Sequence, residues 1–424
     1  MGPTLVAGGA YFGACASMTA CGASAGSPVD AGLEAGNGSS DGADDSTVLV
    51  NFDAIPMNEA GDTGPFDTFD GEGATGEGGN ACQLLTCPGT CVAGRCLFVV
   101  AQGGAYDLVV RSSVVYWTSA GTAPGNGAVL SISSTPTSST GGSQVYSAVQ
   151  NNPHGLAVSA TSLYWANDSP TAGAIVTAPL DGTRDAGAIR ANDAGDAAAS
   201  DAGDAGAALG VTVVAGGQAS PSGIAIDATN LYWTSTGSAA ANNGTVVKMP
   251  LTRRDPVTLA SGRTDPSALA VDSVNVYWVD TGIGAFGGAV LKVPIVGGAV
   301  TTLAAGQNSP GAIVVDTENV YWTQAGNGVH DSAVVKVPIG GGTVTIIASE
   351  QGALGGLTLD STTLYWAVSG GGNGNGAVYA CPLGGNEIKT LASGLDNPFD
   401  LATDATSLYW TDTVDGTITK LTPK

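Results

Sequence analysis

The chain has 424 residues, of which 65 are glycine and 12% are charged, and its formal net charge is −23. With 13 Lys and Arg residues against 36 Asp and Glu, it lacks the clustered positive charge that nucleic acid or an anionic membrane surface requires. No long stretch has a helical apolar period. Short runs of Val, Thr, Tyr and Trp lie between Gly, Asn, Asp and Pro, which is typical of an all-β protein.

Residues 1–21 are apolar and rich in small side chains, like an export signal, although no Lys or Arg precedes Arg95. Met18-Thr19-Ala20-Cys21 resembles the lipobox of bacterial lipoproteins, with Cys21 as the lipidated residue. We therefore expect an extracytoplasmic bacterial protein. It would be either secreted or an outer-membrane or periplasmic lipoprotein that meets the membrane only through its lipid.

Residues 22–81 hold 12 acidic residues, no Lys or Arg and few large apolar groups, so we predict a disordered acidic spacer. Residues 82–96 hold four cysteines: Cys82, Cys87, Cys91 and Cys96. Outside the cytoplasm these would form two disulfides, with three possible pairings, and make a compact knot. A zinc site is the alternative, but the spacing contains no CxxC pair.

The dipeptide Tyr-Trp occurs seven times and accounts for every Trp, at Tyr116, Tyr164, Tyr232, Tyr277, Tyr321, Tyr365 and Tyr409. Successive spacings are 48, 68, 45, 44, 44 and 44 residues. The long spacing contains residues 181–208, which are rich in Asp, Ala and Gly, so we expect a disordered insertion within one repeat.

Each repeat carries four strand signals, and a period near 44 residues is typical of a propeller blade. Adjacent Tyr and Trp side chains point to opposite faces of a strand, so each would pack on a neighbouring blade. We predict a seven-bladed β-propeller over residues 97–424 with four-stranded antiparallel blades. The last repeat lacks an outer strand after Lys424, and residues 97–103 would supply it and close the ring.

The segment from Asn397 to Asp404, followed by SLYWTDTVDGTITKL, resembles a YWTD repeat of the low-density-lipoprotein-receptor type and, more broadly, NHL-type bacterial propellers. The resemblance covers about three-quarters of the chain and implies a propeller architecture. Only Tyr409–Asp412 reads YWTD in full, and receptor YWTD domains have six blades where this chain has seven repeats.

An aspartate recurs five residues before the repeat Tyr, at Asp227, Asp272, Asp316, Asp360 and Asp404. A carboxylate at a tight turn between two strands accepts hydrogen bonds from nearby backbone N–H groups. We therefore predict that these residues cap turns, and a ring of metal ligands is the alternative.

Function should lie on the loops that join the fourth strand to the next blade and the second strand to the third. Binding candidates there are Asn152, His154, Arg263, Asp265, Asn308 and Asn397. The carboxylates of Asp265, Asp280 and Asp412 could hold Ca²⁺. The two histidines, His154 and His330, belong to different repeats, and nothing in the sequence pairs either with a nucleophile.

We therefore expect a monomeric, non-enzymatic binding or scaffold protein without a cofactor that recognises a protein or a glycan, and not nucleic acid. Two alternatives remain open. One is a metal-assisted lyase or a lactonase-type hydrolase at the mouth of the central channel, since streptogramin-lyase-like propellers have a similar repeat period. The other is a structural spacer of the cell envelope.

Overall fold

A computed structural model describes residues 87–92, 94–120, 125–134, 144–180, 210–237, 242–284, 286–325, 332–349, 351–385 and 387–424. The predicted signal segment with Cys21, the spacer 22–81, Cys82 and the insertion 181–208 lie outside these residues. The described part of the chain contains no helix that could cross a membrane.

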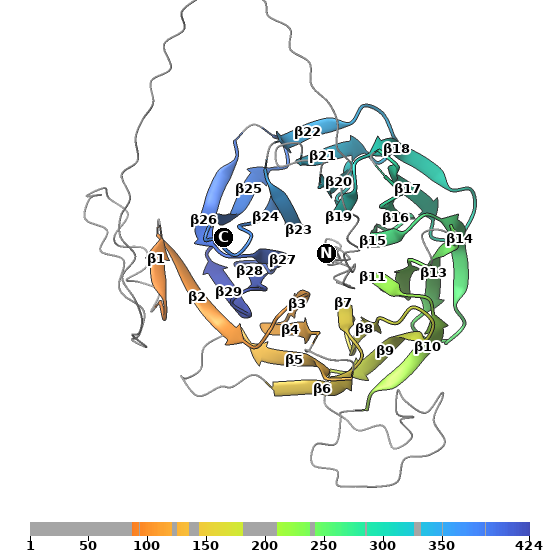
Figure 1. Ribbon diagram of the computed structural model, residues 1–424, viewed down its shortest axis with the longest axis horizontal. Helices are drawn as coiled ribbons and strands as arrows, with labels where there is room; N and C mark the ends of the chain where they lie inside the picture. Colours follow the sequence, from red (N-terminus) through yellow and green to blue (C-terminus); the bar gives the residue numbers. More distant parts are fainter. Residues whose placement is uncertain are drawn as a thin grey trace, which may run out of the picture. The chain divides into compact units, whose positions relative to one another are not determined.

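The described residues form seven antiparallel sheets arranged as blades around a centre (Figure 1). Blade 1 comprises β3 (Leu108–Arg111), β4 (Val114–Ser119), β5 (Gly127–Ser133) and β6 (Gln144–Gln150). Blade 2 comprises β7 (Pro153–Val158), β8 (Ser162–Asn167), β9 (Gly173–Pro179) and β10 (Thr212–Gln218). Blade 3 comprises β11 (Pro221–Ile226), β12 (Asn230–Ser235), β13 (Gly244–Pro250) and β14 (Val257–Arg263).

Blade 4 comprises β15 (Pro266–Val271), β16 (Asn275–Asp280), β17 (Gly288–Pro294) and β18 (Thr301–Gln307). Blade 5 comprises β19 (Pro310–Val315), β20 (Asn319–Gln324), β21 (Ala333–Pro338) and β22 (Thr345–Ser349). Blade 6 comprises β23 (Ala353–Leu359), β24 (Thr363–Ser369), β25 (Gly376–Pro382) and β26 (Lys389–Leu395). Blade 7 comprises β27 (Pro398–Thr403), β28 (Leu408–Asp412), β29 (Thr417–Thr422) and β2 (Arg95–Gln102).

The ring closes as predicted, because β2 pairs antiparallel with β29 and becomes the fourth strand of blade 7 (Figure 1). Leu97 lies opposite Leu421 in this ladder, and Gln102 lies opposite Thr417. We call this junction of the chain's two ends the closure seam. It covers the edge of β29 that blade 7 would otherwise present.

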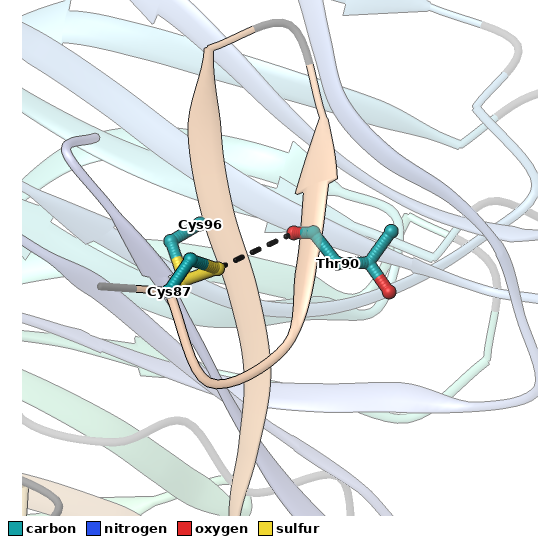
Figure 2. Close-up of a disulfide and its surroundings, with 3 residues drawn as sticks. All are labelled: Cys87, Thr90 and Cys96. Carbon is teal, nitrogen blue, oxygen red and sulfur yellow. Dashed lines mark hydrogen bonds between the residues drawn. A yellow bond between two sulfur atoms is a disulfide. The ribbon is translucent and has the colours of Figure 1, made fainter. Parts of the chain in front are cut away.

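A short fifth strand, β1 (Thr90–Val92), pairs with β2 and was not predicted. The disulfide Cys87–Cys96 joins the start of this hairpin to β2, and the Cys87 Sγ atom lies 3.9 Å from the Thr90 carbonyl (Figure 2). Cys91 is also disulfide-bonded. The cysteine-rich segment thus contains a disulfide, while Cys82 lies outside the described residues.

The Trp of every Tyr-Trp pair is 0% exposed. Each shares a buried cluster with the Tyr of the preceding blade, as Trp165 does with Tyr116 and Trp278 with Tyr232. Across the closure seam, Trp117 clusters with Tyr409 in the same way. Burying about 200 Å² of indole contributes about 5 kcal/mol gross at each position, so the predicted packing of neighbouring blades holds the ring together.

The repeated aspartates cap turns, as predicted. Asp227 accepts hydrogen bonds from the backbone N–H groups of Thr229 (2.6 Å) and Asn230 (2.7 Å), and from the Tyr232 hydroxyl (2.6 Å). The same arrangement recurs at the other four positions, Asp272, Asp316, Asp360 and Asp404.

A glutamine of the preceding blade accepts a hydrogen bond from the indole N–H of four of the seven Trp residues. The Gln307 Oε1 atom of blade 4 accepts from Trp322 Nε1 (3.2 Å) and from Gln324 Nε2 (2.5 Å) of blade 5. The other three glutamines are Gln150, Gln218 and Gln351, each fifteen residues before its Trp. These bonds lie between blades, so they fix the orientation of neighbouring blades.

Gln307→Met should lower the free energy of unfolding by about 1–3 kcal/mol, because the Trp322 N–H loses its acceptor while staying buried. Denaturation by guanidinium chloride measures the change. Gln102→Met is the matched control. Gln102 is exposed, and Trp117 Nε1 has no hydrogen-bond partner within the described residues, so the control should change stability by less than about 0.5 kcal/mol. Equal effects of the two variants would contradict this role of the glutamines.

Lysines of the third strands also join neighbouring blades. Lys248 and Lys292 donate to the carbonyls of Ile295 (2.7 Å) and Ile339 (2.5 Å) in the following blades. Blade 6 has Ala380 at the equivalent position. There Lys424 of blade 7 instead pairs with Asp360 of blade 6, with 2.8 Å between Nζ and Oδ2.

Lys424→Met should destabilise the propeller by about 1–3 kcal/mol at pH 7, because both partners of the ion pair are largely buried. Burial alone raises the pKa of Asp360, but the hydrogen bonds from Lys424, Thr362 and Tyr365 lower it to about 2. A lowered pKa stabilises the fold above the unfolded value and ceases to do so as the pH falls toward 2. The stability difference between the wild type and the variant should therefore shrink between pH 4 and pH 2.

Lys389→Met provides the control, because Lys389 and Glu387 are exposed and lie 3.9 Å apart. It should change stability by less than about 0.5 kcal/mol at any pH. A Lys424→Met variant as stable as this control would contradict a structural role for the Lys424–Asp360 pair.

Candidate functional site

The two sets of loops singled out in the sequence lie together on one face of the ring, which we call the loop face. Backbone hydrogen bonds join them in the same way in successive blades. Thr281 N donates to Asp265 O (3.0 Å) in blade 4, and Thr413 N donates to Asn397 O (3.1 Å) in blade 7. The turns capped by the repeated aspartates join the other ends of the strands, so they lie on the opposite face.

The innermost strand of blades 2 to 7 contains a register shift close to its start. Two positions near this point, eleven and ten residues before the Trp, can be compared in every blade; in blade 1 they lie just before β3, whose ladder has no shift. The first position holds Tyr106, His154, Ser222, Ser267, Gly311, Gly355 and Phe399, and the second holds Asp107, Gly155, Gly223, Ala268, Ala312, Gly356 and Asp400. Blades 3 to 6 thus carry only small residues, whereas blades 7, 1 and 2 carry aromatic, acidic and imidazole groups.

We call Phe399, Asp400, Tyr106, Asp107 and His154 the seam site, because they gather where the innermost strands β27, β3 and β7 adjoin (Figure 1). The rings of Tyr106 and Phe399 lie edge to face, with 5.8 Å between centroids and 72° between planes. Tyr106 is 39% exposed. The pair therefore offers an aromatic surface on the inner strands next to the closure seam.

The two aspartates bridge three blades through backbone N–H groups. Asp400 of blade 7 accepts a hydrogen bond from Leu108 N in blade 1 (2.9 Å), and Asp107 Oδ2 accepts one from Gly155 N in blade 2 (2.8 Å). Both carboxyl groups are 1% exposed. Asp107 Oδ1 has no hydrogen-bond partner among the residues described. One acceptor of the site is thus left unused.

Burial raises the pKa of Asp107 to about 6, against the smaller lowering effect of the Gly155 and Thr118 hydrogen bonds. Burial and the neighbouring charge of Asp107 together raise the pKa of Asp400 well above its usual range. Burial lowers the pKa of His154 to about 4, although the charge of Asp168 opposes this. Perturbed pKa values of this kind gather at functional sites.

Of the predicted binding residues, the structure places His154 in the seam site. Arg263 and Asp280 instead form an ion pair between blades 3 and 4, with 3.1 Å between Nε and Oδ2. Asp280 Oδ1 accepts the hydrogen bond from Trp278 Nε1 (2.9 Å) that a glutamine accepts in other blades. Between blades 3 and 4, this ion pair thus takes the place of the glutamine–tryptophan hydrogen bond found between other blades.

The remaining binding candidates are distributed around the loop face. Asn152 and Asp265 have positive φ angles of 42° and 58°, a conformation that Asn and Asp adopt more readily than most residues. Asn308 is 5% exposed. Asn397 N donates to Asp412 Oδ2 (2.9 Å). The structure brings none of these four into the seam site.

The predicted calcium ligands lie in two different blades. Asp265 and Asp280 are neighbours in blade 4, where the charge of Asp265 contributes to the raised pKa of Asp280 after burial, the larger cause. Asp412 belongs to blade 7 and accepts hydrogen bonds from Val414 N and Asp415 N. Within the described ranges no three His, Cys, Asp or Glu residues are placed to hold a metal ion. His330 lies outside those ranges.

Sequence reasoning missed four of the five residues of the seam site. Tyr106, Asp107, Phe399 and Asp400 are not among the candidates that the sequence suggests. A signal was present, because alignment of the repeats on Trp shows that these positions hold Gly, Ala or Ser in blades 3 to 6. The closeness of residues 106 and 399 follows only from closure of the ring.

Comparison with known protein families gives no match for this chain, and no curated protein matches it. Among solved structures, the β-propeller domain of the Trilobed protease from Pyrococcus furiosus is 10% identical over 73% of this chain and 89% of that chain, with a TM-score of 0.50. This likeness supports the propeller fold alone.

Two other solved structures are similar to this chain at lower TM-scores. A chain in the crystal structure of a nidogen/laminin complex is 21% identical over 59% of this chain and 85% of that chain, with a TM-score of 0.42. An acylaminoacyl peptidase from Pyrococcus horikoshii is 10% identical over 72% of this chain and 48% of that chain, with a TM-score of 0.49.

Asp107→Asn should stabilise the propeller at neutral and alkaline pH. A carboxyl whose pKa is raised by folding stabilises the fold below its unfolded pKa, and that contribution is lost as the pH rises through about 6. Asparagine keeps an acceptor for the Gly155 N–H without the charge. The variant should match the wild type near pH 4 and exceed it by about 1–3 kcal/mol at pH 8.

Denaturation curves at pH 4 and pH 8 measure this difference, and the opposite contribution of His154 cancels because both proteins retain it. Asp255→Asn is the control, since Asp255 is an exposed carboxylate between β13 and β14. It should leave the pH dependence unchanged. A fall in the stability of Asp107→Asn relative to the wild type at pH 8 would contradict the assignment.

Proposed function

We propose that the chain is an extracytoplasmic, non-enzymatic binding propeller that recognises a protein or a glycan on its loop face, around the seam site. The observation that carries the proposal is the asymmetry of the inner ring. Five aromatic, acidic and imidazole side chains occupy three adjacent blades, while the other four blades have Gly, Ala or Ser at the same positions. Ring packing alone does not require this difference, because the small residues suffice in four blades.

The chemistry of the seam site supports binding. Tyr and Trp are the usual anchors of recognition surfaces, because a large ring offers contact area at a small cost in conformational entropy. Exposed apolar side chains elsewhere on the loop face extend the available surface: Ile283 is 62% exposed and Phe286 is 64% exposed. The Cys87–Cys96 disulfide supports a location outside the cytoplasm.

The test is a screen of the purified protein against a displayed peptide library and a glycan array, followed by affinity measurement with Tyr106→Ala/Phe399→Ala. Loss of both rings should weaken binding of a selected ligand by at least about tenfold, since aromatic anchors contribute 2 kcal/mol or more. Thermal unfolding checks that the variant remains folded.

Val274→Ala/Val296→Ala is the matched control. Both valines are exposed, at 59% and 86%, in turns on the opposite face. This variant should bind as the wild type does. Ligands that survive loss of the aromatic pair but not loss of the valines would place recognition elsewhere. A protein that selects nothing from either library would instead fit a structural spacer.

A further inference from the structure

Positive charge is divided unequally between the two faces of the ring. We call the face opposite the loop face the turn face; it carries the turns that join first to second and third to fourth strands. Of the eleven Lys and Arg residues that the structure describes, only Arg263 belongs to the loop face, where it pairs with Asp280. The other ten lie in turns or near strand ends on the side of the turn face: Arg95, Arg111, Lys248, Arg253, Arg254, Lys292, Lys336, Lys389, Lys420 and Lys424.

Negative charge is shared evenly, so the two faces differ in sign. Eight of the sixteen acidic residues described lie near the turn face, and five of these are the capping aspartates. The other eight lie near the loop face: Asp107, Asp168, Asp265, Asp280, Asp396, Asp400, Asp412 and Asp415. The loop face thus has seven negative charges in excess and the turn face two positive charges. Burial raises the pKa of Asp107 and of Asp400, and without these two the loop face still has an excess of five.

The loop face also presents two large apolar side chains on an uncharged hairpin in blade 4. Residues 281–287, which join β16 to β17, include no charged residue. Ile283 is 62% exposed and Phe286 is 64% exposed, and we call these two side chains the apolar finger. The arms of the hairpin touch, because a Cβ atom on Gly282 would lie 2.2 Å from the carbonyl of Gly287. The finger is therefore held in place before it binds, which lowers the entropy cost of a contact.

The backbone of Phe286 is unusual for a bulky residue. Its φ angle is 59°, in the left-handed region that side chains with a Cβ adopt only at a cost. Two positions before the third strand, where Phe286 stands in blade 4, blades 1, 3 and 6 have Gly125, Asn242 and Gly374, which suit a positive φ. Turn geometry would thus favour Gly or Asn here. An exposed aromatic residue kept in such a conformation points to a binding role.

The turn face carries a pocket of about 310 Å³ between blades 5 and 6. Most of its lining side chains are apolar. Among them Leu364 and Cys381 are buried, whereas Ile346 and Ile388 are 63% and 43% exposed. An apolar cavity of about 150 Å³ already holds a benzene ring. The pocket therefore has room for the side chain of Phe286.

We propose that copies of this chain associate head to tail, with the apolar finger of one copy in the pocket of the next and its acidic loop face against the turn face. A second copy fits three separate features: the size of the pocket, its apolar lining and the opposite charges of the two faces. Each pair keeps one free finger and one free pocket, so association continues beyond a dimer. This inference goes beyond the proposed function and takes the place of the expected monomer.

The net charge of −23 does not prevent this contact. Only −5 of it belongs to the described residues, which hold sixteen acids and eleven bases. At about 0.15 M salt, repulsion between exposed charges is screened beyond about 8 Å. The surfaces that face each other therefore decide the electrostatic energy. An anionic membrane is a poorer partner for the finger, because it would repel the acidic loop face.

The test is sedimentation velocity of the full chain at pH 7.5, over concentrations from about 5 to about 500 μM. The wild type should associate with a Kd on the order of 100 μM and form species larger than a dimer at the highest concentrations. Raising the salt from about 0.05 to about 0.5 M should weaken the association, because it screens the attraction between the faces.

Phe286→Asn should weaken association by at least about tenfold, because the aromatic anchor is lost. Asparagine keeps the left-handed turn, as Asn242 does in blade 3, so the variant should remain folded. Ile346→Ser/Ile388→Ser should weaken association to a similar extent from the side of the pocket. Thermal unfolding checks the fold of each variant.

Val149→Asn is the matched control. Val149 is also 64% exposed and also has a positive φ, of 60°, but it belongs to the fourth strand of blade 1. This variant should associate as the wild type does. A wild type that stays monomeric over the whole range would overturn the inference. Association that is equal in Phe286→Asn and the wild type, or equally weakened in Val149→Asn, would do the same.

Mixing the two variants tests the head-to-tail arrangement. Phe286→Asn keeps the pocket, and Ile346→Ser/Ile388→Ser keeps the finger. Each should be monomeric alone, and their mixture should form a dimer with one copy of each and nothing larger. A two-fold contact between fingers would give no mixed dimer, so the absence of a mixed dimer would contradict the arrangement.

A final arm separates self-association from a lipid contact. If the wild type stays monomeric but sediments with vesicles of phosphatidylcholine, and Phe286→Asn does not, the finger binds lipid and the inference is wrong. Failure here is distinguishable from failure of the proposed function. A monomeric protein whose selected ligand is still lost in Tyr106→Ala/Phe399→Ala would retain the binding function and remove only the self-association.

Discussion

The structure depends on one packing interaction: the buried contact between the Trp of one blade and the Tyr of the blade before it. Both residues lie in the same strand, on opposite faces, so every blade presents one ring to each neighbour. A single sheet of this kind cannot cover both faces by itself. Seven such sheets can bury every Tyr and Trp ring only if the last sheet packs against the first. The repeated Tyr-Trp pair therefore favours a closed ring. The glutamine, lysine and aspartate contacts then fix orientation between sheets that are already packed.

Most of the fold could be predicted from the sequence because the repeat is regular. The spacing of Tyr-Trp gave the number of blades, and the missing outer strand after Lys424 identified residues 97–103 as its replacement. The capping role of Asp227 and its equivalents followed from local turn chemistry. Strand β1 escaped prediction, because three residues within a cysteine-rich segment carry no alternating pattern.

The candidate site was much less predictable. His154 was identified from its loop, but Asp107 lies just before β3 and Asp400 lies within β27, and nothing in the local sequence marks either carboxylate as functional. Asp107 and Asp400 are separated by 293 positions in sequence. They come close together only because the ring closes and places blade 7 beside blade 1. Arg263 and Asp280 show a second limit of prediction from sequence. Both looked like surface binding groups, yet they pair with each other and replace a glutamine contact that sequence reasoning had not recognised.

The closure seam has a consequence for how the molecule reaches its native state. Strand β2 pairs with β29 across the whole length of the ring, so this ladder joins segments far apart in the chain and has a high loop-closure cost. The Cys87–Cys96 disulfide does not span that junction, because both sulfurs lie on the N-terminal side of it. The Cys87–Cys96 disulfide can therefore form without closure of the ring, and the pairing of β2 with β29 is noncovalent.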